Sequence, residues 1–157
     1  MQTLLMTGAM QMVAVKQPRS RLRQWGTTLE ATQTMVAVAR RGVRSVLTEW
    51  GWEGERADDL VTICSELVTN AIRHASRPGD TVDLRLQEID GDCRIEVLDS
   101  RPDLSLPRLS VPCGESGRGL ILVRELADDM DVAATPTTKK VWARVLLTAA
   151  ASLRSTA

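Results

Sequence analysis

The chain has 157 residues, with 20 Lys or Arg against 20 Asp or Glu, and it contains no Phe or Tyr. This length suits a single domain, and a composition of 43% hydrophobic and 25% charged residues argues against wholesale disorder and against a disulfide scaffold. Because Phe and Tyr are absent, we expect an aliphatic core. A formal net charge of zero argues against a broad basic surface, so we expect no nucleic acid partner.

The cysteines and the N-terminal segment indicate a cytoplasmic protein. Cys64, Cys93 and Cys113 are widely spaced, form no Cys-x-x-Cys motif and are accompanied by one histidine, so we expect reduced thiols and no structural zinc. No stretch reaches the roughly 18 apolar residues of a membrane span, and residues 1–20 lack the basic start of a signal peptide. We therefore expect no membrane association.

Hydrophobic periodicity predicts one domain over residues 21–148, between a flexible N-terminal arm (1–20) and a tail (149–157). The predicted elements are a strand at 23–29, helices at 32–50 and 55–74, strands at 81–88 and 94–98, a long loop at 100–116, a helix at 120–128, and strands at 130–134 and 140–147. Asp90-Gly91 indicates a tight hairpin between the second and third strands. We expect an α+β two-layer sandwich, in which a mostly antiparallel or mixed sheet of about five strands is covered on one face by three helices.

Three polar residues share one face of the second predicted helix. Glu66, Asn70 and His74 follow at four-residue intervals, which places them within an arc of roughly 80 degrees beside the apolar stripe. A carboxylate can act as a base and an amide oxygen can hold a metal ion or its waters, and phosphoryl transfer needs both functions near one phosphate. A solvated helix edge explains the same spacing and is the more frequent case for one such segment.

Two further segments carry groups that suit a ligand. Asp99 ends a predicted strand, where a buried carboxylate needs a donor such as the exocyclic amine of adenine, although an Asp that starts a turn fits equally well. Residues 114–120 form a glycine-rich segment that runs into a helix. There, Gly117 and Gly119 allow close backbone approach, and the helix start offers N–H groups to phosphate. A flexible linker before a helix explains this segment as well.

The order of these segments resembles the Bergerat ATP-binding fold of the GHKL superfamily, which includes gyrase and histidine kinases. The segment at 66–75 reads ELVTNAIRHA and closely resembles the N box of that superfamily. The segment at 117–123 reads GRGLILV, is followed by Leu-Ala-Asp at 126–128, and resembles its second glycine box. Val-Trp-Ala at 141–143 resembles its last strand. The resemblance covers about residues 23–148 and is greatest to the small anti-sigma-factor serine kinases.

The resemblance implies a site for ATP and Mg2+. Glu66 would be the general base that takes the proton from a serine hydroxyl, and Asn70 would hold the Mg2+ that bridges the phosphates. Asp99 would accept a hydrogen bond from the adenine amine. His74 lies at the far end of the N box, where packing or contact with a partner suits it better than catalysis.

The resemblance also implies a set of phosphate-binding residues. Gly117, Arg118, Gly119 and Leu120 would close over the phosphates as a lid, with Arg118 offering a cation. Lys140 would reach a phosphate or remain solvated.

The sequence departs from the superfamily pattern in two motifs. The first glycine box is usually Asp-x-Gly-x-Gly, but residues 99–103 read DSRPD and contain no glycine. The last motif usually has a Gly and a Thr before the final strand, but residues 137–140 read TTKK. Nucleotide binding is therefore expected to be weaker than in the superfamily at large.

By this resemblance the protein is a serine kinase of the anti-sigma-factor type. It would phosphorylate an anti-anti-sigma (STAS-type) partner, sequester a sigma factor, or do both, and the resemblance also allows a homodimer. One alternative is a degenerate nucleotide-binding module that regulates transcription by contact alone, which the altered first glycine box and Lys140 favour. Another is an ATP hydrolase in which Glu66 activates water.

Overall fold

The computed structural model describes residues 21–74, 77–100 and 115–147. Within them the chain forms three helices and five strands in the order expected from the sequence. The elements are β1 (Leu22–Glu30), α1 (Thr34–Glu49), α2 (Gly54–His74), β2 (Thr81–Ile89), β3 (Asp92–Asp99), α3 (Glu115–Leu126), β4 (Asp129–Ala134) and β5 (Lys139–Leu146).

Four of the features predicted from the sequence lie outside the described residues. These features are the flexible arm (1–20), the tail (149–157), the free thiol of Cys113 and most of the loop at 100–116.

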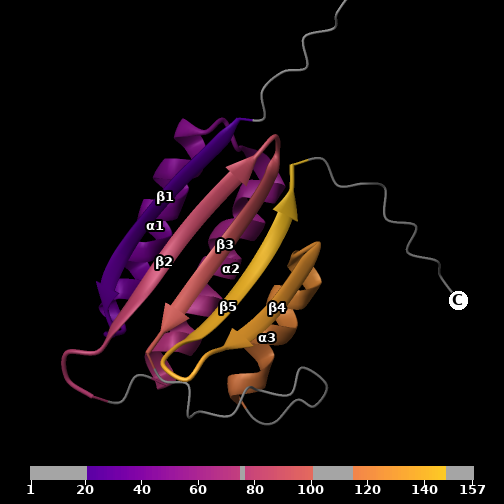
Figure 1. Cartoon of the computed structure of the whole chain (residues 1–157). Coiled ribbons are helices and arrows are strands. Elements are labelled where there is room, and N and C mark those ends of the chain that lie inside the picture. Colours follow the sequence, from indigo (N-terminus) through magenta and orange to yellow (C-terminus); the bar gives the residue numbers. More distant parts are fainter. Residues whose placement is uncertain (1–20, 75–76, 101–114, 148–157) are drawn as a thin grey trace, which may run out of the picture.

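The five strands form one sheet in the order β1-β2-β3-β5-β4, and every neighbouring pair is antiparallel. The three helices lie together on one face of this sheet (Figure 1). The hairpin between β2 and β3 turns at Asp90 and Gly91, whose φ values of 51° and 85° are those of the tight turn that an Asp-Gly pair favours. The expected α+β two-layer sandwich is therefore confirmed.

Helix α2 is the central helix of the layer, because it packs against both α1 and α3 as well as against the sheet. Its buried side chains recur at three- and four-residue intervals, and they include Leu60, Ile63, Cys64, Leu67, Val68 and Ala71. This stripe fixes the rotation of the helix. The residues at its margin, among them Glu66 and Asn70, consequently face α3.

Alternating side chains of the three central strands point toward the helices and form the other half of the core. These rows are apolar except at their ends, where Glu88, Asp99 and Lys139 are buried. Glu88 closes the β2 row near the hairpin. Asp99 and Lys139 lie at the opposite end of the sheet, where they are direct cross-strand partners. Glu88 and the pair formed by Asp99 and Lys139 therefore lie at opposite ends of the sheet. The pair lies at the end of the sheet where α2 also ends.

The core is mainly aliphatic, as the composition predicts, although Trp52 is buried within it as well. Cys64 and Cys93 are free and buried, and burial raises the pKa of each thiol to about 12. Both thiols are therefore protonated near neutral pH and poorly nucleophilic. None of the described helices is both long enough and apolar enough to span a membrane.

Helix α3 begins earlier than the sequence indicates. It starts at Glu115, so Gly117, Arg118 and Gly119 lie in its first turns and not in a loop before it. Glycine is unfavourable in the interior of a helix, which is why the sequence pattern alone places the start of this helix at Leu120. Near a helix start this penalty is tolerated when another group must approach the backbone closely.

Candidate functional site

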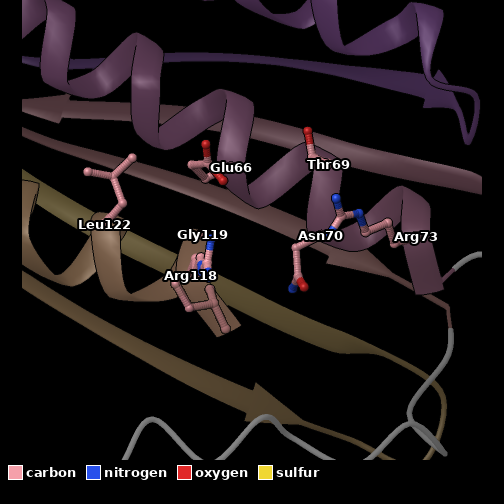
Figure 2. Close-up of a pocket in the computed structure, with 8 residues that line it drawn as sticks. Glu66, Thr69, Asn70, Arg73, Arg118, Gly119 and Leu122 are labelled. Carbon is pink, nitrogen blue, oxygen red and sulfur yellow. The ribbon is translucent and has the colours of Figure 1, made fainter. Parts of the chain in front are cut away.

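A cavity of about 200 Å3 lies between α2 and α3. Figure 2 shows its lining side chains, which reach from α2 and from α3. Helix α2 contributes Glu66, Thr69, Asn70 and Arg73, and helix α3 contributes Arg118, Gly119, Leu120 and Leu122. The cavity is lined by one carboxylate, one amide and two guanidinium groups. Such a set can bind an anion and its counter-ion together.

The positions of Glu66, Asn70 and Arg73 follow from the helical repeat. Asn70 lies four residues after Glu66, and Arg73 lies seven after it, so all three project from the same side of α2. Glu66 and Asn70 are half-buried at the margin of the apolar stripe, whereas Arg73 is exposed. The carboxylate and the amide are thus held by a packed helix, with an exposed guanidinium group beyond them.

Glu66 and Gly119 are in very close contact across the cavity. A Cβ atom built on Gly119 would lie 2.5 Å from Oε2 of Glu66, closer than such atoms approach in proteins. The start of α3 therefore comes against the Glu66 carboxylate at a point where the backbone carries no side chain. This contact explains why the glycine is placed inside the helix.

A second polar cluster lies at the end of the sheet. Asp99 and Lys139 are both buried, and Nζ of Lys139 lies 3.8 Å from Oδ2 of Asp99. His74, the last residue of α2, is close enough that its pKa responds to both charges. Burial is the main cause that lowers the pKa of His74, and the positive charges of Lys139 and Arg73 add to the effect, while Asp99 opposes it. The imidazole is therefore held neutral near pH 7.

Lys140 does not lie with the other predicted site residues. Because side chains alternate along β5, Lys140 points to the face of the sheet that the helices leave uncovered, where its Nζ lies 3.7 Å from Oε1 of Glu96. Lys139 takes the inward position instead. The assignment of a phosphate-binding role to Lys140 thus has no support from its location.

The structure brings together five of the residues selected from the sequence, namely Glu66, Asn70, Arg118, Gly119 and Leu120. Asp99 lies apart from this cavity beside Lys139, and Gly117 is in the first turn of α3.

Sequence reasoning missed Thr69, Arg73, Leu122 and Lys139. The spacing from Glu66 would have identified Arg73, and the alternation of Val141, Ala143 and Val145 would have placed Lys139 inward.

The residues of the cavity fit ATP and Mg2+. Mg2+ in nucleotide sites is commonly held by one or two protein oxygens together with phosphate oxygens and water, and Asn70 offers one such oxygen. Neither Arg73 nor Arg118 forms an ion pair with a described residue, so both guanidinium groups are available to phosphate.

The comparisons with known proteins agree with this arrangement. A family model described as "Histidine kinase-like ATPase domain" matches residues 29–145, which is more than half of the chain. No curated protein sequence matches the chain significantly.

Among solved structures, the chain is similar to the crystal structure of the RsbU and RsbW domains of Rv1364c from Mycobacterium tuberculosis, with a TM-score of 0.57 and 22% identity. The match covers 78% of this chain and 32% of that one, so the present chain spans about a third of the longer protein. At this identity the likeness concerns the fold. Together with the family match, it shows that the chain belongs to the histidine kinase-like ATPase domain family.

Proposed function

We propose that the protein binds ATP with Mg2+ in the cavity between α2 and α3 and transfers the γ-phosphoryl group to a serine of a partner protein. The observation that carries this proposal is the placement of Glu66 and Asn70 one helical turn apart, facing Arg118 and Gly119 across the cavity. The family match supports nucleotide binding, because it covers all of these residues.

The roles of the residues follow from their chemistry. Asn70 would hold the metal ion through its amide oxygen, and Arg73 and Arg118 would neutralise phosphate oxygens. ATP would supply the phosphoryl group. Glu66 would take the proton of the serine hydroxyl as the serine oxygen bonds to phosphorus and the bond to the ADP oxygen breaks.

The proposed partner is an anti-anti-sigma protein of the STAS type, with a sigma factor as a second partner. The resemblance of the N box and the second glycine box to anti-sigma-factor kinases supports this choice, and so does the fold shared with a structure that contains an RsbW domain. A homodimer is part of the same proposal.

The test is transfer of radiolabelled γ-phosphate to a candidate partner. Glu66→Gln should abolish transfer while ATP binding persists, because the amide cannot accept the hydroxyl proton. Glu49→Gln changes an exposed carboxylate at the end of α1 and is the matched control. Transfer that continues undiminished in Glu66→Gln would refute the assigned base. Phosphate release without any protein acceptor would instead identify an ATP hydrolase.

A second candidate function is a nucleotide-binding module that regulates its partner by contact alone. The buried Lys139 beside Asp99 favours it, since the carboxylate that would receive the adenine amine already has a cation as its neighbour. Calorimetry separates the two functions. A contact module would bind its partner equally well with and without ATP and would leave that partner unphosphorylated.

A further inference from the structure

One arginine near the start of α2, Arg56, donates a hydrogen bond from each of its three guanidinium nitrogens. Its Nε donates to the carbonyl oxygen of Leu146 at 2.9 Å, and its Nη1 donates to Asp59 at 3.1 Å. Its Nη2 donates to the carboxylate of Asp128. Leu146 ends β5, and Asp128 lies between α3 and β4. Arg56 therefore ties the first turn of α2 to the ends of β5 and α3.

Asp128, which ends the Leu-Ala-Asp sequence after the glycine-rich segment, is held from several sides. Its Oδ2 accepts a hydrogen bond from the backbone N–H of Leu146 at 2.8 Å as well as the one from Arg56. Its own N–H donates to the carbonyl oxygen of Arg144 at 2.9 Å. The side chains of Arg56 and Asp128 are 20% and 30% exposed, and hydrogen bonds between charged groups are stronger than those between neutral groups. The chain just beyond α3 is thus fixed to α2 and β5.

Helix α3 has little other attachment to the core. Among its described side chains, Leu120 and Val123 are buried, whereas α2 buries nine apolar side chains. An element with few buried contacts has a low local stability. Leu120 and Val123 lie near the middle of α3, so the direction of the helix axis depends on what holds its two ends.

Two contacts, well separated along the helices, join the ends of α3 to α2. Near the start of α3, Gly119 lies against Glu66. Beyond its end, Asp128 is bound to Arg56, which precedes Glu66 by ten residues, or about 15 Å along the axis of α2. Neither Arg56 nor Asp128 is among the residues that line the cavity. A role of this pair in the cavity would therefore be exerted through the position of α3.

We propose that Arg56 is a positioning residue, which holds the end of α3 through Asp128 and thereby sets where Arg118 lies against the phosphates. This inference rests on the proposed function, because it assigns how the same nucleotide site is assembled. Arg56 itself contacts neither the nucleotide nor the serine. A displacement of about 1 Å, caused by a change far from the reacting atoms, can reduce a reaction rate about a hundredfold.

The experiment is a double-mutant cycle between the two arginines, with the affinity for ATP and Mg2+ measured by calorimetry. Arg56→Met keeps an aliphatic side chain and removes the three hydrogen bonds, and it should bind ATP about tenfold more weakly than the wild type. Arg118→Ala should weaken binding to a similar extent. In the Arg118→Ala background, Arg56→Met should cause no further loss. Substitutions more than about 10 Å apart are normally additive, so this result would show that Arg56 acts through Arg118.

Two further variants complete the test. Arg44→Met breaks the exposed ion pair between Arg44 and Asp58, which also joins the start of α2 to a neighbouring helix, and it should bind ATP like the wild type. Asp128→Asn keeps an oxygen for the N–H of Leu146 and removes the charge that attracts Arg56. It should show a smaller loss with the same non-additivity, and it keeps the test decisive where Arg56→Met does not fold. Circular dichroism establishes that each variant is folded.

The outcomes distinguish this inference from the proposed function. Wild-type affinity for ATP in folded Arg56→Met or Asp128→Asn would overturn the role of Arg56 and leave ATP binding intact. A full further loss in the Arg118→Ala background would overturn it as well, because the effect would then not pass through Arg118. Failure of the wild-type protein to bind ATP would refute the proposed function itself, and this inference with it.

Discussion

Oε2 of Glu66 lies 2.5 Å from the position that a Cβ atom would occupy at Gly119, so these two residues fix how closely α3 approaches α2. The contact joins the proposed base to the backbone of the helix that would close over the phosphates. Any side chain at residue 119 must displace either the carboxylate or the first turns of α3. The geometry of the cavity therefore depends on a glycine whose own propensity disfavours a helix.

Gly119→Ala is expected to lower the rate of phosphoryl transfer, because the added methyl group displaces the Glu66 carboxylate from its position in the cavity. The carboxylate is the free end of a flexible side chain, so its displacement costs little, and alanine stabilises a helix by about 1 kcal/mol relative to glycine. We therefore expect the free energy of unfolding in urea to be unchanged or higher. The same change in a Glu66→Ala background, where the space is free, should give the full helix stabilisation. Undiminished phosphoryl transfer in Gly119→Ala would contradict the contact.

Arg73→Ala is expected to weaken ATP binding about tenfold or more, because the variant removes a guanidinium from the cavity. The loss should be larger for ATP than for AMP, since the proposed contact is to the distal phosphates. Calorimetry with both nucleotides measures this difference. Arg41→Ala removes an exposed arginine of α1 and should bind like the wild type. If Arg73→Ala reduced partner binding alone, the arginine would be an interface residue and not a phosphate ligand.

Acid should destabilise the protein through Glu88. The hydrogen bond from Arg23 is the main cause that lowers the pKa of Glu88 below its ordinary 4.5, with a further contribution from the Gly91 N–H. The stabilisation is fully present above pH 4.5 and is lost as the pH falls through the lowered pKa, because the unfolded chain binds the proton first.

Urea unfolding from pH 7 to pH 3 tests this, and Glu88→Gln should flatten the acid side of the curve. Arg23→Met should cost about 3 kcal/mol at pH 7, since it leaves a buried carboxylate without its cation. If the free energy of unfolding of Glu88→Gln fell as steeply with acid as that of the wild type, other carboxylates would be the cause of the acid destabilisation.

Much of the fold can be predicted from the sequence because it depends on hydrophobic periodicity. The stripe of α2 sets the helix rotation, and that rotation alone brings Glu66 and Asn70 to one side. The Asp90-Gly91 turn sets the register of β2 and β3, which in turn places Asp99 on the inward face. These features are local, so a single sequence contains the information.

The features that the sequence analysis missed depend on contacts between distant segments. The start of α3 is set by the approach of Gly119 to Glu66, some fifty residues earlier in the chain, and no local pattern reports it. Lys139 faces the helices and Lys140 faces the opposite side of the sheet, because a one-residue shift along a strand moves a side chain to the other face. Near the end of a strand, two adjacent lysines give little sign of which one points inward.

His74 should make stability depend on pH in a separate range. Its pKa is lowered in the folded protein, chiefly by burial and then by the charge of Lys139. Between this lowered pKa and the ordinary value of 6.5, the unfolded chain therefore binds a proton that the folded chain does not bind. Stability should be constant above about pH 6.5, fall as the pH drops below it, and level off beneath the lowered pKa.

A fall in stability just below pH 6.5 can be assigned to His74, because the chain has one histidine and the stabilisation by Glu88 is lost only below pH 4.5. An NMR titration of the His74 imidazole should give a midpoint below 6.5, and Lys139→Met should move that midpoint upward by removing a nearby positive charge. His74→Gln should remove the slope between pH 6.5 and the lowered pKa. A midpoint at or above 6.5 in the wild type would show that the imidazole is not in the buried, positively charged surroundings described for the end of α2.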